Sequence, residues 1–400
     1  MKYYSFIPLV VILLVEVLLR LQNPYRLWKD AFDESSVCEP DSQRGWKPVP
    51  GIGFDFYHRY MKGKREIKQN SLGLRSSKEY SPVKEQDTYR ILIFGETTLV
   101  GWELEESQTI SSMIEKNLSN EISGKKIEII PVAARNYCLG QLFLWYKTVF
   151  HKFDYDLLIY YFNVNNPRRT ITFHESGKPI LFTKPVFLWS EAEGLRLCGS
   201  PQTKHPNDMI YLGPNDNTII ERGRTARTLH MWLRDCIHVY CALVDCFQGA
   251  TRLRKFNDRT EIKDIEKSTK TKSHGDKILP YQWETCMHIL REWSKLVSKK
   301  SSPMIIIPHM AYYNAGNNWL LTENKHPLGF KYNEIPCRRY LKYITKKINV
   351  EYFDTYQYAY ENRVDTRGFY IHPRYAYYNP IGAEFQSKYI SKMISSYLPS

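Results

Sequence analysis

The chain has 400 residues, of which 43% are hydrophobic and 14% aromatic, and its formal net charge is +14. This composition supports a sizeable core and excludes global disorder, and the length fits one α/β domain with a large insertion. The charge alone would suit nucleic acid, anionic lipid or an acidic polymer. Because the basic residues are scattered and no nucleic-acid-reading motif is present, we expect no nucleic-acid partner. An acidic or glycan ligand remains a possible partner of the chain.

The eight cysteines include no C-x-x-C pair, and Cys236, Cys241 and Cys246 recur every five residues. That spacing suits neither a zinc knuckle nor one face of a helix. We therefore expect no metal and no cofactor. An even number of cysteines permits disulfides outside the cytoplasm, but spacing does not show them.

Residues 3–19 form an almost wholly apolar segment that is interrupted by Ser5, Pro8 and Glu16. At about 1.5 Å per residue, it is at the short end of a membrane span. No small-residue cleavage site follows it, so the sequence favours an uncleaved single-pass anchor over residues 1–22. A cleaved signal peptide and a buried amphipathic helix are the alternatives. The basic residues that follow the segment favour a body facing the cytoplasm.

A mixed, polar juxtamembrane segment at residues 23–88 precedes a regular alternation of elements. Strands are predicted at residues 90–95, 126–133, 156–163, 304–307 and 350–353, and helices at 107–118, 139–150, 283–298, 335–348 and 380–398. This alternation predicts a flavodoxin-like three-layer sandwich with a five-stranded parallel sheet over residues 89–400.

An insertion at about residues 168–282 interrupts the alternation. Within it we expect irregular β structure at 178–200, a helix at 225–247 and a polar loop at 251–278.

Functional groups in open parallel sheets lie at the carboxyl ends of the strands. Here the first strand runs into Gly95 to Gly101, which reads Gly-Glu-Thr-Thr-Leu-Val-Gly, and an N-x-x-G-x-R stretch precedes it from Asn70 to Arg75. The apolar N-terminal segment carries an embedded Glu16 and a trailing Arg20. In their order and spacing, these features resemble the SGNH/GDSL hydrolases of the bacterial membrane-anchored type.

The resemblance implies a serine nucleophile at the end of the first strand. It also implies an oxyanion hole made by a glycine N–H and an asparagine side chain, and an Asp-x-His pair before the last helix. Such a triad lets a base deprotonate the hydroxyl while fixed donors stabilise the oxyanion. The resemblance further implies an extracytoplasmic body that acts on envelope glycans or lipids, which conflicts with the charge count, so the orientation stays open.

Several positions depart from the family pattern. Thr97 occupies the nucleophile position after Glu96, where the family has aspartate. In the second block, Ala133 and Asn136 occupy positions where glycines are usual. Asn165 is the oxyanion-equivalent asparagine, and Asn163 and Asn166 are alternatives.

The block before the last helix departs most. The pattern D-x-H-x-N-x-x-G falls on residues 375–382, where Asn379 and Gly382 match but Tyr375 and Tyr377 replace the aspartate and the histidine. A phenol, with a reference pKa of about 10, is a poor general base at neutral pH.

Two histidines near strand ends, His309 and His372, offer a rescue, and His372 is the first candidate base. A structural role is the alternative for His372, and for Thr97 the alternative is a hydroxyl that caps the following turn.

The missing acid–base pair favours a non-catalytic, membrane-tethered binding or assembly subunit, with other subunits of a membrane complex as partners. An active ester hydrolase or O-acyl transferase is the alternative. We also predict that Tyr375 or Tyr377 packs over the former site and that no histidine nitrogen contacts the Thr97 hydroxyl. Residues 3–20 should form one helix that projects from the body.

Overall fold

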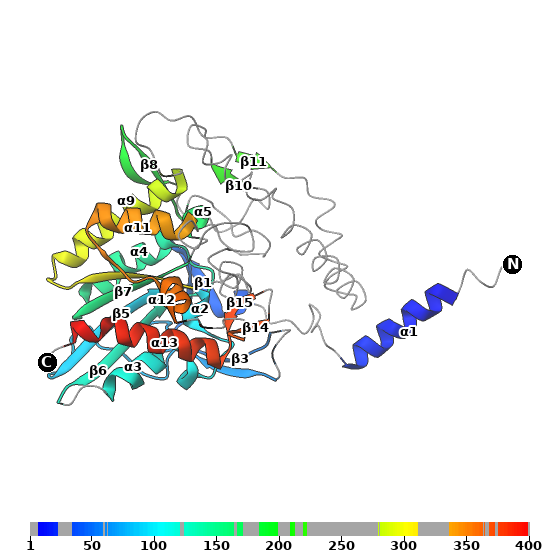
Figure 1. The fold of residues 1–400 in the computed structure, drawn as a ribbon. Helices are drawn as coiled ribbons and strands as arrows, with labels where there is room; N and C mark the ends of the chain where they lie inside the picture. Colours follow the sequence, from blue (N-terminus) through cyan, green and yellow to red (C-terminus); the bar gives the residue numbers. More distant parts are fainter. Residues whose placement is uncertain are drawn as a thin grey trace.

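Figure 1 shows the computed structural model, which describes residues 7–22, 34–58, 61, 63–120, 124–163, 166–170, 184–198, 209–212, 219–221, 279, 281–310, 336–362, 364, 368–372 and 375–398. Asn165, the helix predicted at 225–247 and the loop predicted at 251–278 lie outside these residues.

The centre of the molecule is a sheet of five parallel strands in the order β13-β12-β7-β5-β6. The strands are β5 (Thr88–Gly95), β6 (Lys126–Ala133), β7 (Leu157–Phe162), β12 (Met304–Pro308) and β13 (Glu351–Tyr352). The predicted α/β fold with a five-stranded parallel sheet and a large insertion is therefore confirmed. Counted along the chain the order is 2-1-3-4-5, as in flavodoxin-like sheets.

Helices cover both faces of this sheet. On one face lie α4 (Leu139–Thr148), α9 (Tyr281–Ser298) and α11 (Pro336–Ile348), and on the other lie α3 (Ile110–Ser119) and α13 (Pro380–Ile394) (Figure 1). Successive side chains of β5 alternate between two apolar clusters. Leu92 and Phe94 pack towards α4 and α9, whereas Ile91 and Ile93 pack towards α3 and α13. The strands are apolar on both faces because both faces are covered.

Residues ahead of the sheet form two antiparallel hairpins, which the sequence did not predict. After a short 3₁₀ helix, η2 (Glu34–Val37), β1 (Cys38–Asp41) pairs with β2 (Gly45–Pro48), and β3 (Gly53–Phe56) pairs with β4 (Arg65–Lys68). Trp46 and Leu74 join the cluster on the α4 side, and Phe56 and Ile67 join the other. Residues 34–80 therefore contribute to the same cores as the sheet.

The insertion begins with α5 (Asn166–Thr170) and contains two hairpins, β8 (Val186–Ser190) with β9 (Gly194–Cys198) and β10 (Met209–Leu212) with β11 (Ile219–Glu221). The first hairpin lies within the β structure predicted at 178–200. Phe187 packs on Phe143 of α4, with ring centroids 6.0 Å apart. A Cβ at Gly140 would come within 2.7 Å of the Phe187 ring, so this close approach requires glycine.

The shorter elements complete the chain. They are α2 (Thr97–Val100), η3 (Glu106–Gln108), η4 (Phe150–Lys152), α12 (Thr355–Glu361), the strands β14 (Tyr370–His372) and β15 (Tyr375–Tyr378), and η6 (Ser395–Tyr397).

The N-terminal helix α1 (Ile7–Gln22) has 16 residues, and most of its apolar side chains are exposed. At about 1.5 Å per residue such a helix is about 24 Å long, against a hydrocarbon core of about 30 Å. Within the described part of the chain, no helix is both long and apolar enough to cross a membrane. The membrane helix predicted as part of the fold is therefore not found.

Candidate functional site

Thr97 lies at the carboxyl end of β5, as predicted. The strand ends at Gly95 and the chain turns directly into the single helical turn α2. A Cβ at Gly95 would come within 2.8 Å of Leu99, so the tight turn requires glycine, and Gly101 ends α2 with a φ of +60°. The two hydroxyl residues in this turn, Thr97 and Thr98, are both buried.

The Thr97 hydroxyl accepts a hydrogen bond from the backbone N–H of Asn136, with 3.1 Å between nitrogen and oxygen. Asn136 has a φ of +62°, in the left-handed region that asparagine tolerates better than most residues. This explains how asparagine occupies a position where glycine would be expected. Ala133, predicted as an oxyanion-equivalent position, is the last residue of β6 and pairs with Gly95 in the sheet.

The neighbouring hydroxyl, that of Thr98, meets a histidine. The Thr98 Oγ1 lies 3.3 Å from Nε2 of His309, which follows β12. The backbone N–H of His309 donates to the carbonyl of Phe162 at the end of β7, 2.8 Å away. The imidazole contacts the rings of Tyr161 and Tyr378 edge-on, at centroid distances of 5.8 and 5.6 Å. Of the two histidines noted from the sequence, His309 therefore belongs to this end of the sheet.

Glu96, the residue before Thr97, is only 2% exposed, and Arg169 and Asn163 are among the side chains that bind its carboxylate. Nη1 of Arg169 lies 2.5 Å from its Oε2, and Nδ2 of Asn163 donates to the same oxygen over 3.2 Å. Burial raises the pKa of Glu96 above its ordinary value, while the charge of Arg169 acts in the opposite direction. Lys184 adds a further nearby positive charge.

This cluster spans the place where the strand order reverses. Glu96 follows β5 and Asn163 follows β7, and these two strands are neighbours in the sheet although β6 lies between them in sequence. In open α/β sheets, ligands bind in the crevice outside the carboxyl ends at this reversal. Here an internal contact between Glu96 and Asn163 bridges it.

The asparagines considered as oxyanion donors have different surroundings. Asn165 lies outside the described residues. Asn163 donates to Glu96. Asn166 is fully buried, accepts from the N–H of Leu139 over 2.7 Å and donates to the hydroxyl of Tyr160 over 2.7 Å. Asn166 therefore ties the start of α4 to the sheet.

The block before the last helix forms the hairpin β14–β15, in which His372 pairs with Tyr375. The side chains of these two residues lie outside the part of the chain that the structure describes. Asn379 and Gly382, the matching residues of the block, shape the start of α13. Oδ1 of Asn379 accepts from the N–H of Gly382 over 3.0 Å, and a Cβ at Gly382 would lie 2.3 Å from the carbonyl oxygen of Phe369.

Tyr377 packs against a buried arginine that sequence reasoning missed. The guanidinium of Arg135 lies 5.3 Å from the centroid of the Tyr377 ring, 4.7 Å from that of Trp102 and 5.2 Å from that of Phe56. Its Nη1 is 2.8 Å from a carboxylate oxygen of Glu103, and both side chains are almost fully buried. In the sequence, the one sign of this cluster is that Arg135 is the neighbour of Asn136. The residues that surround Arg135 come from distant segments of the chain.

Comparisons with known proteins add little to this geometry. No protein-family model and no curated protein sequence matches the chain. Among solved structures, a lipase/acylhydrolase from Enterococcus faecalis is similar over 78% of this chain and 97% of its own, at 11% identity and a TM-score of 0.37. The acetyl xylan esterase AlAXEase is similar over 76% and 99%, at 10% identity and a TM-score of 0.37.

Chemically, the described site offers hydroxyls, one imidazole and ion-paired carboxylates. No group of three or more His, Cys, Asp or Glu side chains among the described residues could hold a metal ion. The hydroxyl of Thr97 accepts a backbone N–H, and the nearest carboxylate in sequence, Glu96, is engaged by Arg169.

Proposed function

We propose that the chain is an SGNH-type protein that binds a ligand or partner at the carboxyl end of its sheet without hydrolysing it. The observation that carries this proposal is the hydrogen bonding of the site. The Thr97 hydroxyl accepts the N–H of Asn136, and Arg169 holds the adjacent carboxylate of Glu96.

The chemistry supports the same conclusion. A hydroxyl nucleophile needs a base within hydrogen-bond reach, and loss of one member of a triad costs several orders of magnitude in rate. At the positions where the resemblance expects the acid and the base, this chain has Tyr375 and Tyr377. The Tyr377 ring packs on the Arg135 guanidinium. The methyl group of Thr97 also restricts the rotamers of its hydroxyl.

One observation favours the second candidate, an ester hydrolase or O-acyl transferase. The hydroxyl of Thr98 and Nε2 of His309 lie 3.3 Å apart, which is the kind of contact a nucleophile makes with its base. Against this, the two residues are 8% and 2% exposed, so a substrate carbonyl has little access to either.

A phosphonate probe that reacts with activated hydroxyls separates the two candidates. Full-length protein is incubated with the probe, and intact mass is measured for the wild type, Thr97→Ala and Thr98→Ala. We expect no adduct in any of the three. An adduct lost in Thr97→Ala would overturn the proposal, and one lost only in Thr98→Ala would establish the second candidate.

Membrane attachment of residues 1–22, with the body extracytoplasmic, is a separate part of the proposal. Its support is α1, whose exposed apolar side chains are Val10, Val11, Ile12, Leu13, Leu14, Val15, Val17, Leu18 and Leu21. Sedimentation with lipid vesicles tests attachment: the full chain should pellet with vesicles, and a variant with Leu13→Asn and Leu14→Asn should pellet less. Equal pelleting of both would contradict it. Other subunits of a membrane complex and an acidic or glycan ligand are the partner classes that we propose for the body.

A further inference from the structure

The N-x-x-G-x-R stretch ahead of the sheet has no part in the function proposed above, yet its polar groups are well organised. Oδ1 of Asn70 accepts from the N–H groups of Leu72 and Leu74, both over 3.0 Å, and its Nδ2 donates to the carbonyl of Lys78 over 2.9 Å. Gly73 has a φ of +75°, and a Cβ there would lie 2.8 Å from the carbonyl oxygen of Pro48. The stretch is therefore a turn that the Asn70 side chain holds together and that requires glycine at position 73.

The turn places the Arg75 side chain against residues 100–104, which lie far along the chain. Arg75 is 7% exposed. Its Nη1 donates to the carbonyl of Val100 over 3.0 Å and also to that of Gly101, and its Nη2 donates to the carbonyl of Leu104 over 2.6 Å. Val100 ends α2, and Gly101 and Leu104 belong to the turn that follows. One guanidinium thus donates to three backbone carbonyls between residues 100 and 104, as its planar fork of donors allows.

The helix α2 needs such support because it is a single turn. Its backbone bonds run from the N–H groups of Leu99 and Val100 to the carbonyl of Glu96 and from the N–H of Gly101 to that of Thr97. One helical turn does not offset the entropy of ordering it, and the last carbonyls of a helix have no donor within the helix. Arg75 supplies the donor for these carbonyls.

We propose that Arg75 is a positioning residue for the site, which holds α2 so that the hydroxyls of Thr97 and Thr98 meet the Asn136 N–H and the His309 imidazole. The inference goes beyond the proposed function, because it holds whether or not the site turns over a substrate. Burial lowers the pKa of Arg75 to about 10, with Glu103 and Glu106 acting against this, so the desolvated cation depends on its carbonyl partners.

The test compares Arg75→Met and Arg75→Lys with the wild type in the full-length protein. A matched control is Arg44→Met. It removes another buried arginine that precedes the sheet, and the ion pair of Arg44 is with Asp41 rather than with α2. Amide hydrogen exchange is measured for residues 97–104 and, as an internal reference, for β7. The ¹⁵N resonance of His309 Nε2 reports the Thr98 contact, and Thr98→Val gives the resonance expected when that contact is lost.

In Arg75→Met we expect exchange over residues 97–104 to rise by about tenfold, the equivalent of one charge-assisted hydrogen bond, with β7 unchanged. The His309 resonance should move towards that of Thr98→Val. Arg75→Lys should raise exchange over residues 97–104 less than Arg75→Met does, since an ammonium keeps the charge but cannot reach all three carbonyls. If Arg75→Met does not fold, Arg75→Lys alone decides.

Three results would overturn the proposal. In the first, the folded Arg75 variants keep wild-type exchange over residues 97–104 and an unmoved His309 resonance. In the second, exchange becomes faster in β7 as much as in residues 97–104, and in the third, Arg44→Met produces the same local change as Arg75→Met.

Discussion

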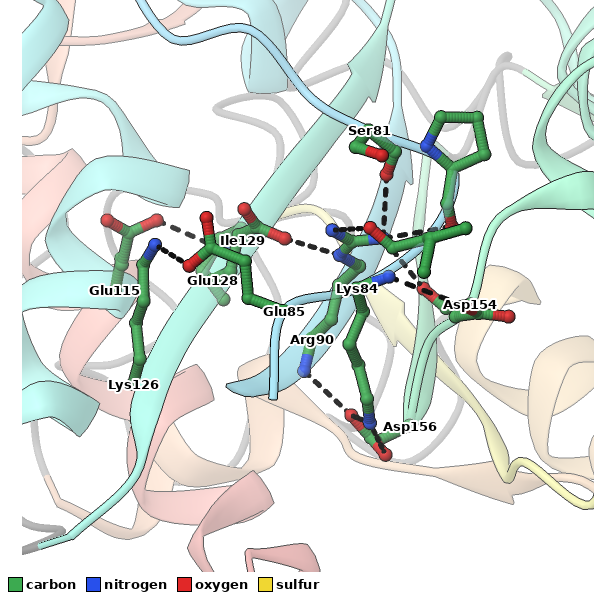
Figure 2. Close-up of polar contacts among 12 residues, drawn as sticks. Ser81, Lys84, Glu85, Arg90, Glu115, Lys126, Glu128, Ile129, Asp154 and Asp156 are labelled. Atoms are coloured by element: carbon green, nitrogen blue, oxygen red, sulfur yellow. Dashed lines mark hydrogen bonds and ion pairs between the residues drawn. The ribbon is translucent and has the colours of Figure 1, made fainter. Parts of the chain in front are cut away.

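The two ends of the central sheet both contain ion pairs, but they hold them in different surroundings. At the amino ends of the strands, Figure 2 shows Arg90 bound to Glu128 and to backbone carbonyls, including that of Ser81 at 2.9 Å. Asp156 accepts from the backbone N–H of Arg90 over 2.8 Å and from Nζ of Lys84 over 2.5 Å. The carboxylates there stay in part hydrated, since the side chains of Glu128 and Asp156 are 15% and 27% exposed.

At the carboxyl ends the carboxylates are withdrawn from water. The side chains of Glu96 and Glu103 are each 2% exposed, and their partners Arg169 and Arg135 are 13% and 4% exposed. Buried carboxylates lose their hydration, and the resulting cost is offset only by close partners. The amino ends of the strands therefore serve as a structural rim. The carboxyl ends hold the perturbed acid, Glu96, that is typical of functional sites.

Arg90→Met should have the largest effect. The substitution leaves Glu128 and several carbonyls without their donor, and breaking a buried pair in this way costs about 3–5 kcal/mol. Urea denaturation measures the free energy of unfolding. A loss below about 1 kcal/mol would show that the amino ends do not form a structural rim.

Arg169→Met should cost less, about 2 kcal/mol at neutral pH, because Glu96 can take up a proton once its partner is gone. The same reasoning predicts that the cost shrinks on acidification, since a protonated Glu96 no longer needs a positive partner. Denaturation at two pH values measures this. A cost that is independent of pH would mean that Glu96 is not the group that Arg169 stabilises.

Glu96→Gln should change the pH dependence of stability. Because burial raises the pKa of Glu96 in the folded state, its contribution is fully present below the unfolded pKa and is lost as pH rises through the folded pKa. Relative to the wild type, Glu96→Gln should therefore become more stable as the pH rises from about 4, the ordinary pKa of a glutamate. The difference in unfolding free energy between the two proteins is measured across this range, and the opposite slope would contradict the assignment.

Tyr377→Ala should have the smallest effect, a loss of about 1 kcal/mol from the contact with Arg135. Tyr377→Phe is the matched control, and it should be near neutral because the ring face is kept. Thermal unfolding of both variants makes the comparison. Equal destabilisation by the two changes would assign the effect to the hydroxyl and not to the ring.

The sheet could be predicted from sequence because its strands are short apolar runs between helical repeats. Residues 126–133 were predicted to be a strand and are one, and the strand predicted at 90–95 needs only Thr88 and Tyr89 at its start. The early hairpins escaped prediction because strands such as Cys38–Asp41 are four residues long and partly exposed. So short a segment has no readable period.

The site could be predicted only in part. Thr97 was placed correctly because it lies only two residues beyond the end of an apolar strand. The partners of the neighbouring groups come from far along the chain: Arg169 is 73 residues from Glu96, and His309 is 211 residues from Thr98. Such pairs depend on how the strands are ordered in space, and neither spacing nor composition encodes that order.

Ester turnover shows whether Thr97 is a working nucleophile. The full-length protein is assayed on short acyl esters beside Thr97→Ala, with Thr98→Ala as a second control. We expect all three proteins to hydrolyse the esters at the background rate. Robust turnover in the wild type that Thr97→Ala abolishes would show that Thr97 is a nucleophile.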